Sequence, residues 1–219
     1  TARYHAFTAV NTEMLKAYFE IGRNIVEEEQ KGRERAEYGE KLIKRLSKDL
    51  SNEFRKGYSK EDLKKGSLSY VALHELAHDY LYYKNSAKNL QDLFHYIFEL
   101  TATLLGMRIA GSLLLQEVIT SKELESMIIA FICRSFDLVE KSKTSKSLIN
   151  YALGGEIFIN FMLKSGAIKQ KEGMTMPNFM KIFVSLHELC YILERLLASG
   201  ARRDAEVLVR KYAHLNNAA

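Results

Sequence analysis

The sequence predicts an all-α protein, built from an N-terminal helical segment with a helix-turn-helix-like end and a larger helical bundle. Helix-forming residues dominate its 219 positions and there is a single proline, so the chain has few obligatory breaks. Apolar side chains recur every three or four residues over most of its length, which is the period of an amphipathic helix. Because 47% of the residues are hydrophobic, a substantial core can form.

The N-terminal segment is expected to hold three helices joined by short turns. Apolar residues at three- and four-residue spacing predict one helix over 3–30 and a second over 34–55. A turn follows at 56–58, and Ser59 opens a third helix with a capping-box-like sequence. A helix, a three-residue turn and a further helix make a helix-turn-helix-like arrangement.

The rest of the chain, residues 67–219, is expected to form a helical bundle that follows a domain of residues 1–65. Gly66-Ser67 is expected to interrupt the third helix and to mark the junction. Gly154-Gly155 should end another helix, and a polar stretch between two glycines predicts a short hairpin within 156–176. Further helices are predicted from apolar periodicity and capping residues over 69–83, 88–110, 121–142, 144–153, 177–198 and 202–214. Thr120 with Glu123 makes a capping box for the helix over 121–142, and Pro177 suits the first turn of the helix over 177–198.

A set of residues in the N-terminal segment matches a known pattern. The set comprises Val10-Asn11, Tyr18, Glu20-Ile21-Gly22, Ile25-Val26-Glu27, Tyr38-Gly39, Leu46-Ser47-Lys48-Asp49-Leu50, Phe54, Gly57-Tyr58-Ser59 and Leu63. With this pattern, residues 1–65 resemble the N-terminal domain of YhcG-type proteins. The resemblance implies a helical domain that binds DNA and usually precedes a PD-(D/E)xK nuclease-like domain. Residues 66–219 contain no such nuclease constellation, so the resemblance does not extend to nuclease activity.

Basic side chains gather around the turn at 56–58, where they are candidates for DNA contact. They are Arg55, Lys56, Lys60, Lys64 and Lys65. A basic helix N-terminus beside a turn can hold phosphates through side chains and free backbone N–H groups. Residues 1–66 carry 15 Lys and Arg against 12 Asp and Glu, so the alternative is a solvated helical hairpin whose lysines balance its acids.

Residues 74–78, HELAH, fit the zinc-peptidase pattern H-E-x-x-H. On a helix, His74 and His78 lie one turn apart on the same face, where both can ligate one zinc ion. Glu75 lies beside them and could act as general base for a water molecule. Glu99 is the candidate third ligand. Through HELAH and the following Glu-Leu-Thr-Ala, residues 71–105 resemble gluzincin-type metallopeptidases, including antirestriction-associated ones.

The same stretch is also consistent with helix packing. Zincins usually place a β-sheet before the active helix, whereas the residues before His74 read as helix. VALHEL at 71–76 is nearly repeated as VSLHEL at 184–189, with Tyr191 at the position of His78. A sequence that uses this pattern twice could place a histidine and a glutamate at the border of a leucine face.

A third interpretation of HELAH is a closed, structural metal site. His95 and Glu99 are four residues apart and therefore share one face of their helix. If that face met His74 and His78, four ligands would surround one ion inside an antiparallel bundle. His95 is therefore an alternative ligand.

Charge and cysteine content indicate the cellular compartment and the partners to expect. The formal charge of +5 mildly favours anionic partners such as nucleic acid. Cys133 and Cys190 lie in apolar helical runs and are expected to be buried thiols of a reducing compartment. No signal-peptide pattern is recognisable, and charged residues interrupt each apolar run before 18 residues. We therefore expect a cytoplasmic protein without a membrane span.

These patterns favour a non-enzymatic, DNA-associated or interaction module of the defence or mobile-element type. Its expected partners are DNA, another protein or a second copy of the chain. The first alternative is a zinc metallopeptidase in which His74, His78 and Glu99 are ligands and Glu75 is the base. The second is a helical oligomerisation module without catalytic chemistry. The sequence leaves the cofactor unknown, with zinc as the candidate that HELAH offers.

Overall fold

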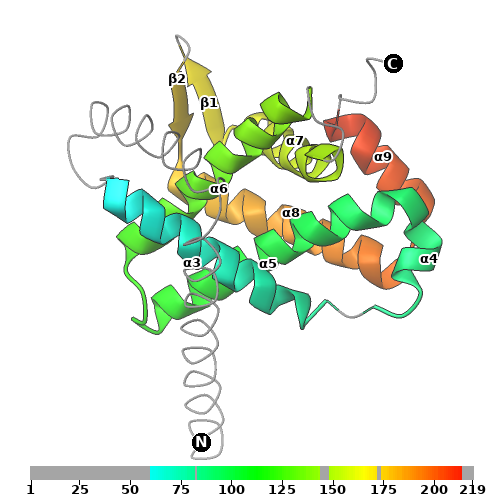
Figure 1. Ribbon diagram of the computed structural model, residues 1–219, viewed down its shortest axis with the longest axis horizontal. Helices are drawn as coiled ribbons and strands as arrows, with labels where there is room; N and C mark the ends of the chain where they lie inside the picture. Colours follow the sequence, from blue (N-terminus) through cyan, green and yellow to red (C-terminus); the bar gives the residue numbers. More distant parts are fainter. Residues whose placement is uncertain (1–59, 82, 144–147, 172–173, 214–219) are drawn as a thin grey trace, which may run out of the picture. The chain divides into compact units, whose positions relative to one another are not determined.

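The computed structural model describes residues 60–81, 83–143, 148–171 and 174–213 (Figure 1). The helices expected over 3–30 and 34–55, with Arg55 and Lys56, lie outside these residues. Within the described residues the chain is helical apart from one hairpin, which confirms the predicted fold class. In chain order the elements are α3 (Lys60–His78), α4 (Ser86–Leu90), a short 3-10 helix (Gln91–Leu93), α5 (Phe94–Leu115), α6 (Ser121–Ser142), α7 (Ile149–Lys164), β1 (Ile168–Lys171), β2 (Met174–Pro177), α8 (Phe179–Ser199) and α9 (Arg202–Tyr212).

Internal contacts divide the chain into two compact units, and the divisions fall inside α5 and α6. The described part of the first unit contains α3, the second half of α5 from Gly106 and the first half of α6 up to Phe131. The second unit contains the first half of α5, the second half of α6, and the elements α4, α7, β1, β2, α8 and α9.

In the first unit, α3 runs through Gly66 and Ser67 without a break, so the predicted interruption there is wrong. Gly66 is buried where α3 crosses α6, and a Cβ atom at this position would lie 2.6 Å from the backbone carbonyl carbon of Ser126. A glycine inside a helix costs about 1 kcal/mol relative to alanine. Close approach of two helix backbones is a reason to keep it. The division of the chain at residue 65 stays a prediction.

Helix α6 begins at the predicted residue and ends at the predicted residue. The capping box predicted for its start is present, because the backbone N–H of Thr120 donates to Oε2 of Glu123 at 2.9 Å. In return the backbone N–H of Glu123 donates to Oγ1 of Thr120 at 3.2 Å. The reciprocal pair thus satisfies two backbone N–H donors for which the start of a helix offers no acceptor within the helix.

In the second unit, α7 continues through Gly154 and Gly155 to Lys164, so its predicted end at the two glycines is wrong. Both glycines are buried. A Cβ atom on Gly155 would lie 3.1 Å from the Cα atom of Ser135 on α6. The glycines therefore mark a close helix crossing. Packing at the crossing offsets the free-energy cost of glycine in a helix, and the sequence of α7 alone does not show this packing.

The predicted hairpin is confirmed within the described residues. Strands β1 and β2 pair in antiparallel register, from Ile168 opposite Pro177 to Lys171 opposite Met174. The next helix was expected to begin at Pro177, but Pro177 instead ends β2. Asn178 caps that helix instead, because its Oδ1 accepts from the backbone N–H of Lys181 at 3.0 Å.

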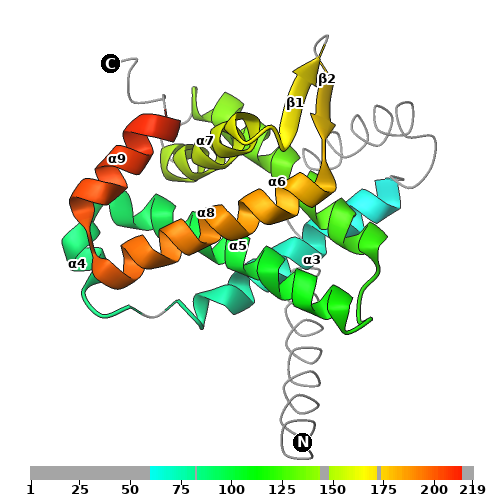
Figure 2. The ribbon, with the colours of Figure 1, turned by 180° about the vertical axis from the view of Figure 1, so that it is seen from behind.

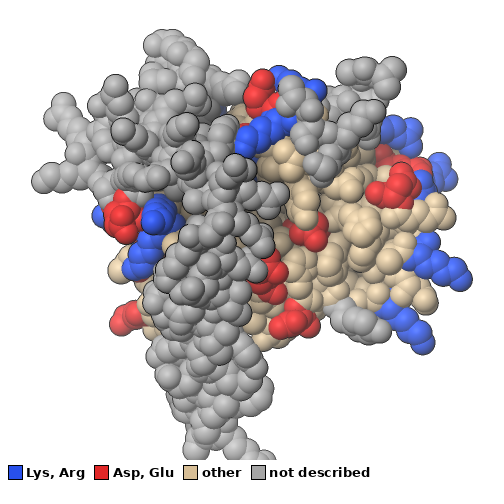
Figure 3. Space-filling model, viewed as in Figure 1, with Lys and Arg blue, Asp and Glu red and all other residues tan. Residues whose placement is uncertain are grey.

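One arginine joins the last helix, α9, to the chain around Leu90 and Asp92. Arg202 donates through Nη1 to Oδ1 of Asp92 at 2.8 Å and to the carbonyl oxygen of Leu90 at 3.0 Å, and through Nε to Glu206 at 3.0 Å. Lys and Arg side chains gather beside α4 and α9 at the right-hand edge of Figure 3. Arg202 therefore belongs to a structural network, and its charge is already engaged.

The stretch Ser86–Leu115 is long and apolar enough to cross a membrane, and 61% of its apolar window is buried inside the protein. Core helices of this composition are apolar all round because protein surrounds them. Cys190 is buried, as expected, whereas Cys133 is half-buried. A cytoplasmic location stays a prediction.

Candidate metal centre

The HELAH sequence occupies the last turns of α3. Its leucine side is buried, with Leu73 at 0% and Leu76 at 8% exposure. His74 and His78 are half-buried, and Glu75 is exposed. Residues four apart on a helix lie one above the other, so the two imidazoles share the flank between core and solvent.

The two imidazoles approach each other through their Nε2 atoms. These atoms are 3.1 Å apart, and the ring planes are nearly perpendicular at 85°. Two nitrogen ligands of one tetrahedral zinc ion, each about 2.05 Å from it, lie about 3.3 Å apart. The observed pair therefore has the spacing of two ligands of one ion. The same distance also fits an N–H···N hydrogen bond between neutral rings.

Glu99 on α5 is the third side chain of the set that the sequence predicts. His74 and His78 belong to the first unit and Glu99 to the second, and each of the three side chains offers one atom that can ligate a metal. All three side chains are half-buried. Two imidazole nitrogens and one carboxylate oxygen form a donor set that suits zinc and leaves a fourth position open.

His95 lies one turn before Glu99 on α5. Its side chain is exposed, and its ring contacts Phe94 with centroids 5.6 Å apart. The four-ligand arrangement that sequence periodicity allowed would need His95 to share a site with Glu99, and it stays a prediction.

Gly106 of α5 lies against the backbone of α3 just before His74. A Cβ atom on Gly106 would lie 2.8 Å from the carbonyl carbon of Leu73 and 3.0 Å from the backbone nitrogen of His74. The backbones of α5 and α3 therefore touch at this point, and any larger residue would push them apart. The role of Gly106 was not predicted from the sequence. The available signal was a glycine inside the apolar helical run TATLLGMRIA.

The second copy of the pattern, VSLHEL on α8, shares the leucine face but not the histidine pair. Leu186 and Leu189 are 1% and 0% exposed, and Glu188 is exposed like Glu75. Tyr191, at the position of His78, is 62% exposed. The expectation that the pattern borders a leucine face is thus confirmed for both copies, while the facing imidazoles occur in the first.

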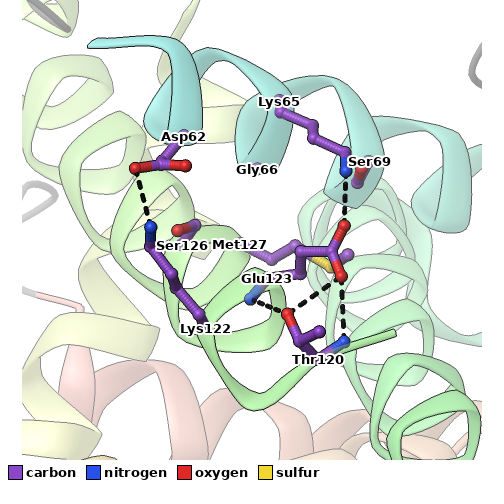
Figure 4. Close-up of a pocket in the computed structure, with 9 residues that line it drawn as sticks. All are labelled: Asp62, Lys65, Gly66, Ser69, Thr120, Lys122, Glu123, Ser126 and Met127. Carbon is purple, nitrogen blue, oxygen red and sulfur yellow. Dashed lines mark hydrogen bonds and ion pairs between the residues drawn. The ribbon is translucent and has the colours of Figure 1, made fainter. Parts of the chain in front are cut away.

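A polar pocket of about 260 Å³ lies between the first turns of α3 and of α6 (Figure 4). Two ion pairs cross it: Lys65 Nζ lies 2.5 Å from Glu123 Oε1, and Lys122 Nζ lies 3.1 Å from Asp62 Oδ2. These pairs neutralise the charges that a ligand would use. The charged residues of the pocket therefore serve to join α3 to α6. Of the predicted DNA contacts, Lys65 is engaged here and Lys64 is exposed.

The contribution of the Lys65–Glu123 ion pair to stability depends on pH. Burial alone would raise the pKa of Glu123, but hydrogen bonds from Lys65 and Thr120 outweigh it and hold the pKa below its ordinary value of 4.5. A lowered pKa in the folded state adds stability above pH 4.5, and this contribution is lost as the pH falls through the lowered value.

We therefore expect Glu123→Gln to lower the free energy of unfolding at neutral pH and to flatten its fall between about pH 5 and pH 3. Denaturant unfolding at a series of pH values measures this. Glu117→Gln, which changes an exposed carboxylate outside the pocket, is the matched control. An unchanged pH profile in Glu123→Gln would contradict the assignment.

Comparison with known proteins shows what the N-terminal part is similar to. Residues 1–91 match the family of the DUF1016 N-terminal domain. Over 71 residues the chain is 48% identical to the putative nuclease YhcG of Escherichia coli strain K12. The match covers 32% of this chain and 19% of that protein. The predicted YhcG-type resemblance is confirmed, and the family match extends through α3 to include HELAH.

The fold is similar to two solved structures. Dipeptidyl-peptidase III from Caldithrix abyssi has a TM-score of 0.57 at 19% identity, over 70% of this chain and 31% of that one. Dipeptidyl-peptidase III from Corallococcus sp. strain EGB has a TM-score of 0.56 at 22% identity, over 69% and 30%. At these identities the likeness concerns the fold, and the chain spans less than a third of each structure.

Proposed function

We propose that His74, His78 and Glu99 form the zinc centre of a peptidase-type hydrolase. The carrying observation is the Nε2–Nε2 separation of 3.1 Å on α3, which matches two nitrogen ligands of one ion. Glu99, the third ligand that the sequence predicts, would complete a three-ligand set with an open fourth position. Neutral imidazoles and an ionised carboxylate are the protonation states that such a site requires.

Zinc held by these side chains would polarise the substrate carbonyl and make a water molecule more acidic. Glu75 follows His74 directly, and its carboxylate is exposed beside the histidine pair. It would accept the proton of the attacking water and deliver it to the departing amine. The exposure of Glu75 leaves this side of the site open to a substrate.

The substrate class is supported by the fold. Both similar structures are named dipeptidyl-peptidase III, so a helical arrangement of this kind occurs within chains named for cutting peptides. Arylamide dipeptides, whose cleavage releases a coloured or fluorescent amine, are the first substrates to assay.

Metal titration of the purified protein tests the zinc centre. We expect about one equivalent of zinc per chain, removed by a chelator and restored by added zinc. His187→Ala removes the histidine of the second pattern copy, in which Tyr191 stands at the position of the second histidine, and should leave the metal content unchanged. Absence of zinc binding in the unmodified protein would refute the proposal.

A second proposed function is DNA association through the N-terminal segment. It is supported by the 48% identity to a protein named as a putative nuclease and by the cluster of Arg55, Lys56, Lys60, Lys64 and Lys65. The two functions involve different stretches of the chain, so both can hold. An interaction module without catalysis remains the alternative for the whole protein.

Replacing Lys56, Lys60 and Lys64 together by alanine should weaken duplex binding and lower its dependence on salt. Each phosphate contact that is lost reduces the slope of log affinity against log salt by about 0.9. Fluorescence anisotropy with a short duplex at several salt concentrations measures both quantities. The control variant removes three exposed lysines elsewhere in the chain and has the same net charge: Lys88, Lys143 and Lys169. Equal losses in the two variants would show a nonspecific charge effect and refute the assignment.

A further inference from the structure

Helix α8 carries a row of large apolar side chains on its outer side. Met180, Val184 and Tyr191 are 78%, 66% and 62% exposed. They are spaced four and seven residues apart and therefore lie on one side of the helix. The opposite side holds the buried residues Ile182, Leu186, Leu189 and Leu193, and α8 contacts α4, α7 and α9. Figure 2 views α8 from the front, where it crosses the second unit.

Two opposite charges flank Tyr191 within this outer strip. Glu188 lies three residues before Tyr191 and Arg195 lies four residues after it, and both are exposed. The Arg195 guanidinium carbon lies 5.9 Å from the centre of the Tyr191 ring. The strip thus has an aromatic centre with a negative charge on one side along the helix and a positive charge on the other.

We propose that this strip is a self-association surface, on which α8 packs antiparallel against α8 of a second copy of the chain. A two-fold axis beside Tyr191 would reverse the helix direction. Glu188 would then face Arg195 of the partner subunit, and the same pair would form a second time by symmetry. Tyr191 would meet the partner's Tyr191 between the two ion pairs.

The arrangement of charges is what selects a second copy as the occupant. A two-fold interface brings the same patch together with itself, so a patch of one sign would repel its mate. This strip carries one charge of each sign at nearly equal distances from its aromatic centre. It is therefore complementary to itself when reversed, and aromatic side chains such as Tyr191 are enriched at the centre of interfaces.

Charge reversal tests the proposal by sedimentation velocity over a range of protein concentrations. The unmodified chain is expected to show a monomer–dimer equilibrium. Glu188→Arg and Arg195→Glu should each raise the dimer dissociation constant about tenfold, because each change places like charges together twice. The double variant restores both pairs in reversed order and should return to within about threefold of the unmodified value.

A cysteine at the axis gives a second readout. Tyr191→Cys should form a disulfide-linked dimer under mild oxidation, since the two thiols would face each other. Val207→Cys, at an exposed position on α9, is the matched control and should stay monomeric. A chain that is monomeric at every concentration, or a double reversal no better than the single ones, would overturn the proposal. Binding of the strip to a different protein or to DNA without self-association would overturn it as well.

Discussion

His78→Ala should abolish stoichiometric zinc binding while leaving the protein folded. The variant removes one of two imidazole nitrogens that lie 3.1 Å apart on a single helix. Changes to groups that merely orient a metal ligand cost about 10- to 100-fold in affinity, so loss of a ligand itself should exceed about 100-fold. His78 is half-buried at the end of α3, so its truncation removes little core. Metal content after dialysis, together with zinc titration, measures the effect.

The pattern of variants separates three interpretations of HELAH. An open three-ligand site predicts that His74→Ala, His78→Ala and Glu99→Ala all lose zinc. It also predicts that His95→Ala, which changes an exposed residue outside the set, keeps it. A closed structural site predicts that His95→Ala weakens binding too. If HELAH serves packing alone, no variant changes the metal content, because the unmodified protein holds none.

The histidine pair could be predicted from sequence because its geometry is local. A four-residue spacing on one helix is enough to bring His74 and His78 together, whatever the helix packs against. The prediction of Glu99 rested on a resemblance, and the choice between Glu99 alone and Glu99 with His95 depends on tertiary packing, which no local pattern reports. Within the first unit, the contact of Gly106 with Leu73 is an example of such packing.

The wrongly predicted breaks in α3 and α7 have a common cause in glycine. Gly66 and Gly154-Gly155 were expected to end helices, since glycine costs about 1 kcal/mol in a helix interior. Each instead lies where two helix backbones approach closely, and packing there outweighs the local cost. The capping box at Thr120 and Glu123 was predicted correctly because both partners lie within one turn of chain. Sequence periodicity thus located most helices but not the crossings between them.

Glu75→Gln should keep the zinc and lose the hydrolysis of arylamide dipeptides. Glutamine has nearly the shape of glutamate but cannot accept a proton at neutral pH, and a general base contributes about 10²- to 10⁴-fold to a rate. Glu75 is exposed, whereas the residues of the ligand set are half-buried. A change at Glu75 should therefore leave metal affinity and thermal stability close to those of the unmodified protein. Parallel measurement of zinc content and of the rate of amine release gives both halves of the expectation.

The matched control is Glu188→Gln, at the equivalent position of the second pattern copy on α8. Glu188 is exposed like Glu75 and follows a histidine in the same way, but Tyr191 replaces the second histidine there. It should therefore leave the hydrolytic rate unchanged. Zinc binding in the unmodified protein without hydrolysis would favour a structural metal and remove Glu75 from a catalytic role. Equal hydrolysis by Glu75→Gln and the unmodified protein would show that the activity arises elsewhere, because the proton of the attacking water would have another acceptor.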